Sequence, residues 1–423
     1  MNHFEARRGE LHCEDVPLRR IAEMVGTPAY VYSTATLKRH YQVFVEAFAP
    51  RQVKVAYAVK ANSNLSVLAT LAGLGAGADT VSEGEIRRGL TAGVAAERIV
   101  FSGVGKTAHE LAFALDAGVG QINVESEPEL QLLSAIAAGR GARPRIAIRV
   151  NPDIGAGGHA KISTGKAESK FGVSLAEAER LYARAAASDA LEPVGLACHI
   201  GSQITDLAPL EAAYVTLRDL AGRLRAQGLP LSGLDLGGGL GVPYFNQPAP
   251  PPPAELGRMV GRVFQGVDAE LSLEPGRVIT ANAGVLLSRV IHVNARPDGR
   301  RFLVLDAAMN DLIRPAMYDA YHDIRPVGAA PDDGPRLAYD VVGPVCETGD
   351  TFTRDRLLPE LGSGDLVAFM TAGAYGAAMA SEYNTRPLAP EVLVNGAEFA
   401  VVRPRPTYDE MLAREPLAPW LGR

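Results

Sequence analysis

Short β-rich runs alternate with longer segments of helical period from about residue 53 to residue 275, and this alternation constrains the fold more than any other feature. Between the runs lie helical segments such as LSVLATLAGLG, EGEIRRGLTAG and LEAAYVTLRDLAGRLRAQG, several of which end on glycine, as helices often do. Eight runs have the apolar, β-branched character of buried strands: 54–60, 78–82, 98–103, 121–126, 145–151, 193–201, 233–239 and 269–276. Eight successive βα units predict an α/β fold of the TIM type, a parallel (β/α)8 barrel.

A different pattern begins after about residue 280, where short alternating runs are separated by Gly and Pro. The runs VLLSRVIHV, RFLVLDA, LAYDVVGPV, DLVAFM and EVLVNGAEFAVV predict an antiparallel all-β domain, a sandwich or a barrel. We expect the first 30 residues, with PAYVYS, to add strands to this domain. A chain of 423 residues is long enough for two domains. We therefore predict a barrel over residues 36–282 and a β domain made of residues 1–35 and 283–423.

Composition and charge exclude several classes of protein. The chain has 42 basic and 48 acidic residues, a net charge of −6 and no basic block, which argues against nucleic-acid binding. Its three cysteines, Cys13, Cys198 and Cys346, form no CxxC pair, so we predict neither a disulfide framework nor a metal site. The sequence also lacks a signal-peptide-like start and any run of about 18 apolar residues. We therefore expect a cytoplasmic protein that does not bind membranes.

Reactive side chains follow the predicted strands at their carboxyl ends, where a barrel of this type has its active site. Taken singly, each has an ordinary structural explanation: an ion pair for Lys60, tight turns for the glycines, and Arg277 as the partner of Glu274. Their common location at one rim of the barrel favours a catalytic or binding role over a structural one. The set consists of Lys60, Ser82, Glu83, Arg149, Asn151, His199, Gly237, Gly238, Gly239, Glu274, Gly276 and Arg277.

The chemistry of these side chains suits an aldehyde cofactor that carries a phosphate. A desolvated lysine among other cations has a lowered pKa and becomes an amine nucleophile, which fits an imine at Lys60. The segments LDLGGGLG and EPGR offer closely spaced backbone N–H groups for a phosphate, although tight turns explain the glycines equally well. Glu274 suits a protonated pyridine nitrogen, and the imidazole of His199 suits stacking on a cofactor ring.

Four segments resemble the barrel signatures of the alanine-racemase-type pyridoxal-5′-phosphate (PLP) decarboxylases: YAVKAN at Lys60, HIGSQ at His199, GGGLG at 237–241 and EPGR at 274–277. The likeness runs over nearly the whole chain. The segments DAAMNDLIRPAMYDAYH (306–322), GPVCETGD (343–350) and HAKISTGKAESKFG (159–172) are similar to the branch that acts on meso-diaminopimelate in the last step of bacterial lysine synthesis. Two departures are mild: the second strand reads VSEGE, and Thr348 stands where serine is common.

The resemblance implies a role for each matching residue. Lys60 would carry PLP as the internal aldimine, His199 would stack on its ring, and Glu274 would bind the pyridine nitrogen. It also implies a homodimer with shared active sites, in which the partner subunit supplies the loop with Cys346 and Glu347. The β domain would contribute to the active site and to the dimer interface. The phosphate would be held by Gly238, Gly276, Arg277 and Tyr375, and the substrate by Arg277, Arg314, Tyr318, Glu347 and Tyr375.

The expected substrate has an amino-acid centre at each end, so the enzyme must hold one end while it cleaves a bond at the other. Arg277 and Arg314 suit the distal carboxylate, because a guanidinium binds it bidentately, and Glu347 suits the distal ammonium. The thiol of Cys346 suits the proton donor. Segment 153–170, rich in Gly, Ser and Lys, is a candidate lid. The alternatives are a decarboxylase for another basic amino acid, a racemase, a non-catalytic PLP carrier or regulatory pseudoenzyme, and a barrel phosphosugar enzyme.

Overall fold

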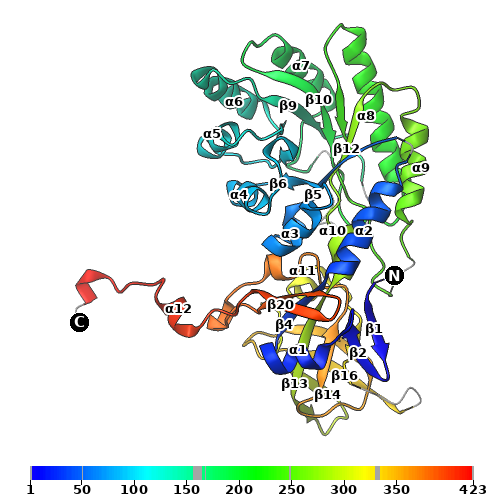
Figure 1. Ribbon diagram of the computed structural model, residues 1–423, viewed down its shortest axis with the longest axis vertical. Helices are drawn as coiled ribbons and strands as arrows, with labels where there is room; N and C mark the ends of the chain where they lie inside the picture. The colour runs from blue at the N-terminus through cyan, green and yellow to red at the C-terminus, as the bar shows by residue number, and fades with distance from the viewer. Residues whose placement is uncertain are drawn as a thin grey trace. The chain divides into compact units, whose positions relative to one another are not determined.

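The computed structural model describes residues 2–49, 51–155, 164–166, 168–246, 249–328 and 334–421 (Figure 1). The chain divides into two compact units, one of residues 37–280 and one of residues 1–36 with 281–423. Much of the candidate lid, residues 156–163 and 167, lies outside the described residues. In the part of the chain that the structure describes, no helix is long and apolar enough to cross a membrane.

The unit of residues 37–280 is a closed barrel of parallel strands, which confirms the predicted (β/α)8 fold. Neighbouring strands follow the chain order, and β12 pairs with β5 to close the barrel. All the predicted strands are present: β5 (Lys54–Ala58), β6 (Gly77–Thr80), β7 (Ile99–Phe101), β8 (Gln121–Val124), β9 (Arg145–Val150), β10 (Glu192–Cys198), β11 (Gly233–Asp235) and β12 (Glu270–Leu273).

Helices follow the strands and lie around the outside of the barrel (Figure 1). They are α3 (Leu65–Ala72), α4 (Glu83–Thr91), α5 (Ala108–Asp116), α6 (Glu127–Arg140), α7 (Leu175–Ala186), α8 (Ala208–Ala226), α9 (Pro253–Val263) and the short α10 (Arg277–Thr280). The helix α2 (Thr34–Glu46) precedes the first barrel strand. Ser82, Thr107, Ser126 and Ser174 cap α4 to α7, each accepting a hydrogen bond from a backbone N–H of the first turn. The structure thus gives Ser82 a capping role.

The second unit contains a nine-stranded sheet with the order β17-β16-β14-β13-β4-β19-β20, in which β18 also pairs with β13 and β15 pairs with β18. Its strands are β4 (Ala29–Ser33), β13 (Gly284–Ala295), β14 (Arg301–Leu305), β15 (Ile324–Pro326), β16 (Arg336–Val342), β17 (Thr351–Pro359), β18 (Leu366–Phe369), β19 (Glu391–Asn395) and β20 (Glu398–Arg403). The sheet is mostly antiparallel, as predicted, but β4 pairs with β19 and β14 with β16 in parallel.

The N-terminal segment is built into this second unit. β4 lies between β13 and β19, and a small sheet of β1 (Phe4–Arg7), β2 (Glu10–Cys13) and β3 (Val16–Pro17) precedes α1 (Leu18–Val25). The buried carboxylate of Glu14 accepts hydrogen bonds from Ser33 Oγ at 2.8 Å, Ala35 N at 2.8 Å and Gly396 N at 2.6 Å. Because a buried carboxylate needs such donors, Glu14 ties the start of the chain to the turn between β19 and β20.

Candidate active site

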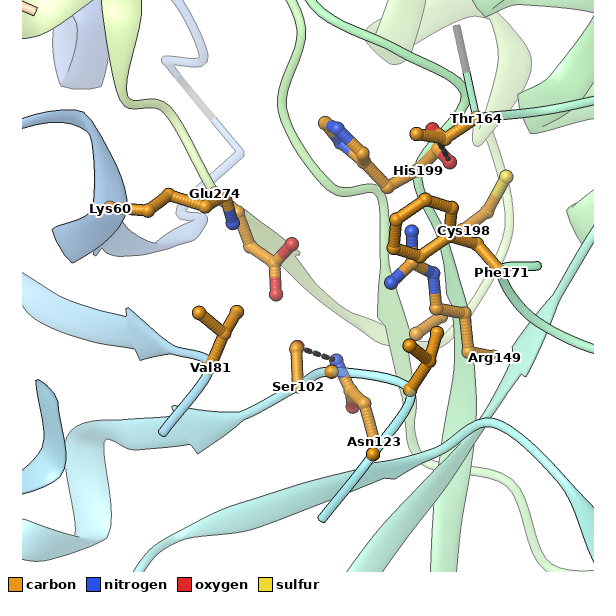
Figure 2. Close-up of a pocket in the computed structure, with 14 residues that line it drawn as sticks. Lys60, Val81, Ser102, Asn123, Arg149, Thr164, Phe171, Cys198, His199 and Glu274 are labelled. Atoms are coloured by element: carbon orange, nitrogen blue, oxygen red, sulfur yellow. Dashed lines mark hydrogen bonds between the residues drawn. The ribbon is translucent and has the colours of Figure 1, made fainter. Parts of the chain in front are cut away.

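A cavity of about 450 Å³ opens at the carboxyl ends of the barrel strands, and its size is typical of a cofactor site. It brings together Lys60, Arg149, His199 and Glu274 from four different strands of the predicted rim. Lys60 lies in a 3-10 turn after β5, Arg149 is on β9, and His199 and Glu274 follow β10 and β12. In Figure 2, Lys60 and Glu274 lie on one side of the cavity and His199 and Arg149 on the other.

Lys60 forms an ion pair with Asp79, a residue of β6 that the sequence analysis did not identify. The distance between Lys60 Nζ and Asp79 Oδ2 is 2.5 Å. Asp79 is completely buried, and its Oδ1 accepts no hydrogen bond from the described residues. The ion pair that the sequence allowed as an ordinary explanation of Lys60 is therefore present. A buried carboxylate such as that of Asp79 needs a cation beside it. The ion pair therefore keeps the amine of Lys60 at the cavity.

Glu274 is buried in a cluster of acids with Asp235 and Asp79, and no ion pair between Glu274 and Arg277 is found among the described residues. Burial raises its pKa well above the ordinary value, and the nearby charges of Asp235 and Asp79 raise it further. Burial also raises the pKa of Asp235, which shares a hydrogen bond with Glu274. Oε1 of Glu274 accepts no hydrogen bond within the described residues. A site with excess acid and an unsatisfied buried oxygen fits a cationic nitrogen, such as a protonated pyridine.

His199 is held as a neutral imidazole. Gly238 N donates to His199 Nδ1 over 3.1 Å, so the neutral ring carries its proton on Nε2. Burial lowers the pKa of His199 well below its ordinary value, and the positive charges of Arg149 and Lys60 lower it further. The hydroxyl of Thr164 donates to the His199 carbonyl at 2.9 Å and fixes the backbone there. A flat, uncharged ring at a cavity wall suits contact with an aromatic ring.

The glycines at the rim allow close approach of backbone segments. An added Cβ at Gly238 would lie 2.2 Å from the carbonyl oxygen of Glu274, and one at Gly276 would lie 3.0 Å from the Cβ of Ala61. Gly237 has a φ of 63°, which favours glycine. The N–H of Gly238 is engaged by His199. The role of Gly238 and Gly276 in phosphate binding therefore stays a prediction.

Arg277 is held by two hydroxyl groups that the sequence analysis missed. Its Nη1 donates to Tyr244 Oη at 2.7 Å and its Nη2 to Ser202 Oγ at 3.0 Å. Both partners lie in loops after strands of the barrel, and the guanidinium is buried. Ser202 lies in the segment HIGSQ, which also contains His199. No local sequence pattern identifies Tyr244 as the second partner of Arg277.

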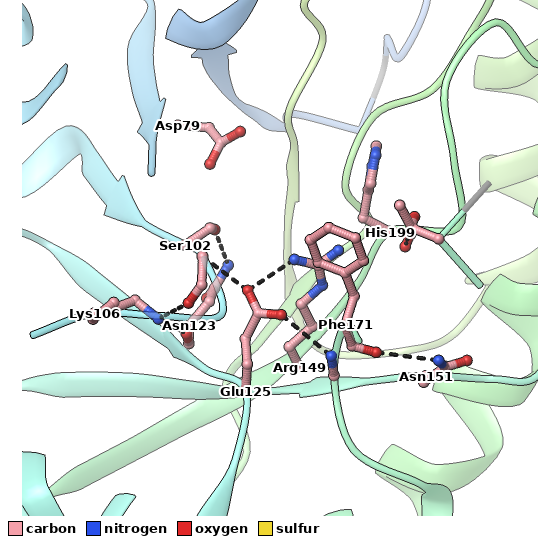
Figure 3. A network of polar contacts seen from close by, with 12 residues as sticks. Asp79, Ser102, Lys106, Asn123, Glu125, Arg149, Asn151, Phe171 and His199 are labelled. Carbon is pink, nitrogen blue, oxygen red and sulfur yellow. Dashed lines mark hydrogen bonds and ion pairs between the residues drawn. The ribbon is translucent and has the colours of Figure 1, made fainter. Parts of the chain in front are cut away.

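A polar network forms the wall of the cavity behind Arg149 (Figure 3). The carboxylate of Glu125 accepts hydrogen bonds from Arg149 Nη1 at 2.8 Å, Gly103 N at 2.8 Å and Gly172 N at 3.2 Å. The guanidinium of Arg149 lies over the ring of Phe171, 5.0 Å from its centroid. Because Glu125 joins three segments of the rim, we infer that it keeps Arg149 in place at the cavity. Charged residues inside the runs QINVES and RIAIRV were the only sequence signal for this pair.

The predicted site residues of the second unit lie on three of its segments. Arg314 and Tyr318 are on α11 (Arg314–Tyr318), and Tyr375 follows β18 with a φ of 55°. Cys346 and Glu347 are exposed on the loop between β16 and β17. That the five residues meet Lys60 in one active site stays a prediction.

The loop with Cys346 has defined supports. Asp350 accepts hydrogen bonds from Met309 N through Oδ1 and from Val345 N through Oδ2, each at 2.7 Å. Cys346 N donates to Asn384 Oδ1 at 2.9 Å. Asp350 thus fastens the loop to the segment before α11, and Asn384 fixes the backbone of Cys346 itself. Asn384 is 38 residues away from Cys346 in the chain, and no local sequence pattern identifies it.

Glu85, in the first turn of α4, gives a testable pH dependence of stability. Burial raises its pKa from 4.5 to about 7, and the charge of Asp79 adds to this rise. The folded protein thus binds the proton more tightly than the unfolded chain, so stability decreases as pH rises from about 4.5 to about 7. Glu85→Gln keeps an acceptor for Val81 N but cannot ionise. We expect it to raise the free energy of unfolding by at most about 3 kcal/mol at pH 8 and to change it little at pH 4.

Unfolding measured between pH 4 and pH 8 tests this expectation. Glu97→Gln, a change at an exposed residue of the same unit, is the control and should keep the parental profile. A Glu85→Gln profile parallel to that of the parent protein would contradict the assignment.

Comparisons with known proteins agree with this geometry. The sequence model of the family "Pyridoxal-dependent decarboxylase, pyridoxal binding domain" matches residues 34–281. The diaminopimelate decarboxylases of Zymomonas mobilis and Pseudomonas aeruginosa are 47% and 49% identical to the chain, over 99% of this chain and 99% and 100% of theirs. The crystal structure of diaminopimelate decarboxylase from Helicobacter pylori complexed with L-lysine superposes with a TM-score of 0.90 at 42% identity, over 94% of this chain and 98% of that chain.

The matches extend over both units, and the cavity holds the lysine, the histidine and the acid that the matched segments predict. The chain therefore belongs to the pyridoxal-dependent decarboxylases and, within them, to the diaminopimelate decarboxylases.

Proposed function

We propose that the enzyme decarboxylates meso-2,6-diaminopimelate to L-lysine and CO2, the last step of bacterial lysine synthesis, with PLP held at Lys60. The observation that carries this proposal is the cavity in which Lys60, His199 and Glu274 meet. An amine, a flat neutral ring and an unsatisfied acid are the groups that PLP needs from a protein. The similar Helicobacter pylori enzyme was crystallised with L-lysine, the product expected here.

PLP, when bound, supplies an electron sink for the electron pair that CO2 leaves behind. Lys60 Nζ would hold its aldehyde carbon, the ring of His199 would cover one face, and Glu274 would lie against the pyridine nitrogen. The backbone at Gly238 and Gly276, together with Arg277 and Tyr375, would bind the phosphate. The acid cluster supports this assignment, because a cation at Oε1 of Glu274 would offset the charge of Asp235 and Asp79.

The protein's own groups would bind the substrate and move the proton. Arg277 and Arg314 would bind the carboxylate of the distal centre, and Glu347 its ammonium, which would orient the reacting bond. Tyr318 and Tyr375 would complete this site. Cys346 would deliver a proton from Sγ to the carbon that has lost CO2. We propose that Cys346 and Glu347 come from the partner subunit of a homodimer, whose interface includes the second unit.

Incubation of the PLP-loaded protein with meso-diaminopimelate tests the function directly. We expect equal amounts of CO2 and L-lysine, and much slower CO2 release from L-ornithine or L-lysine, which lack a second carboxylate for the arginines. Release of CO2 from L-ornithine but not from diaminopimelate would show that the substrate is misassigned. Racemisation of an amino acid without CO2 release would place the enzyme among the racemases of the same barrel.

Arg314→Ala tests the proposed distal site. Loss of a charge-assisted hydrogen bond costs about 1.5–3 kcal/mol, so we expect the KM for meso-diaminopimelate to rise by about 10- to 100-fold. Arg300→Ala, which removes an exposed arginine paired with Asp298 on a hairpin of the same unit, should leave the KM unchanged. Steady-state kinetics measure both variants. An unchanged KM in Arg314→Ala would remove this residue from the substrate site.

A further inference from the structure

His322 lies between Arg314 and the backbone of the second unit. It follows α11 in the chain, and both its side chain and that of Arg314 are buried. Its Nε2 is 2.8 Å from Arg314 Nη1, and its Nδ1 is 2.9 Å from the carbonyl oxygen of Met370. The imidazole therefore connects the guanidinium to the main chain through two short contacts.

The two partners define the protonation state of this imidazole. A carbonyl oxygen only accepts hydrogen bonds, so the Nδ1 that faces Met370 must carry a proton. A guanidinium only donates, so the Nε2 that faces Arg314 must be the unprotonated acceptor. Both conditions are met by one species, the neutral tautomer with its proton on Nδ1.

The anchor of this chain of contacts, Met370, adjoins the sheet of the second unit. Met370 directly follows β18, which pairs with both β13 and β15. The N–H of Met370 also donates to the carbonyl of Asp323 at 2.8 Å, so the residue next to His322 is bound to the same backbone. The position of Nε2 is thus set by the sheet and not by the short helix that carries Arg314.

A neutral partner affects an arginine differently from a carboxylate. Arg149 in the barrel unit is paired with the carboxylate of Glu125, which offsets its charge. The imidazole of His322 directs the guanidinium of Arg314 through a hydrogen bond while leaving its positive charge in place. Such an arrangement suits an arginine whose charge is needed for an anionic ligand.

We propose that His322 is a positioning residue for substrate recognition: as a neutral acceptor anchored on Met370, it holds the Arg314 guanidinium in the orientation that binds the distal carboxylate of the substrate. This inference rests on the proposed role of Arg314. It adds a residue that touches neither the reacting atoms nor the substrate and acts only through Arg314.

Two substitutions at His322 separate positioning from simple packing. In His322→Gln the side-chain oxygen can reach the place of Nε2 and accept from Arg314. In His322→Asn the shorter amide can still donate to Met370 but cannot reach Arg314. If positioning is the role, the glutamine variant should retain the function of the parent enzyme and the asparagine variant should lose it. His292→Asn, at an exposed position of β13, is the matched control.

Binding of L-lysine to the PLP-loaded enzyme reads the distal site without turnover, because L-lysine keeps the amino-acid centre that is not decarboxylated. We expect His322→Asn to raise its dissociation constant by about 10-fold or more, the effect of one lost charge-assisted hydrogen bond, and His322→Gln to change it less than about 3-fold. Cadaverine has no carboxylate, so its dissociation constant should be the same in all variants. Calorimetry supplies these constants, and kinetics should show the loss in KM more than in kcat.

A double variant, His322→Asn in the Arg314→Ala background, tests whether His322 acts through Arg314. Because His322 acts through Arg314, we expect no further loss of L-lysine affinity in the double variant. Equal losses in the glutamine and asparagine variants, an equal loss for cadaverine, or the same loss in both backgrounds would each overturn the positioning role. Unchanged L-lysine affinity in Arg314→Ala alone would instead show that the proposed substrate site is wrong.

Discussion

Replacing Lys60 with alanine is expected to abolish the covalent attachment of PLP and, with it, turnover. Nζ of Lys60 is the amine at the cavity, and Asp79 holds it there at 2.5 Å. Loss of a catalytic nucleophile commonly costs a factor of about 10⁴ or more in rate. We therefore expect kcat to fall by at least about 10⁴-fold and the visible absorption band of lysine-bound PLP to disappear.

Borohydride reduction followed by peptide mass analysis identifies the attachment site in the parent protein, and the modified peptide should contain Lys60. Lys54→Ala is a matched control, because Lys54 lies at the start of β5, the strand that precedes Lys60, where it is exposed and paired with Glu270 at 2.6 Å. This variant should keep both the absorption band and the activity. A Lys60→Ala protein that kept the band, or a modified peptide from another part of the chain, would refute the assignment of Lys60.

The barrel could be predicted from the sequence because its strands are short, mostly buried runs and most of them are followed by a helix of regular period. Strand β17 was not predicted. Its sequence TFTRDRLLP places Arg354, Asp355 and Arg356 in the middle of the strand, and β17 lies at the edge of its sheet. An edge strand is exposed along one side, and Asp355 has a left-handed backbone conformation with a φ of 49°. The alternation of apolar and polar residues that identifies a strand in a sequence is therefore absent here.

The candidate site was predictable to the extent that its residues stand at strand ends. Lys60, His199 and Glu274 do so, and the structure places them at one cavity. Supporting contacts join distant parts of the chain. In the barrel unit, Asp235, a neighbour of Glu274, contacts Asn123, which is 112 residues away. In the second unit, His322, the neighbour of Arg314, reaches Met370 across 48 residues. Such pairs depend on how the barrel closes and how the sheet is ordered, which no local pattern encodes.

Replacing Cys346 with alanine is expected to leave PLP binding intact and to lower kcat by about 10²- to 10⁴-fold, as for the loss of a general acid. Cys346 is exposed on its loop, and Asn384 and Asp350 fix the backbone around it. An exposed thiol on a fixed backbone can donate a proton to a substrate carbon and be reprotonated from solvent. In Cys346→Ser, a weaker acid at the same place should give a rate between those of the alanine variant and the parent enzyme.

A second cysteine, Cys198, is an alternative candidate for the proton donor. Cys198 lines the cavity, but it is buried, and burial raises its pKa to about 12. An acid of that strength is poorly matched to proton transfer at neutral pH, whereas an ordinary cysteine thiol is well matched. Cys13, buried in the core of the second unit, serves as the control, and Cys13→Ala should keep the parental kcat. If Cys346→Ala kept its turnover and Cys198→Ala lost it, the proton would come from the barrel and the loop with Cys346 would have no part in the chemistry.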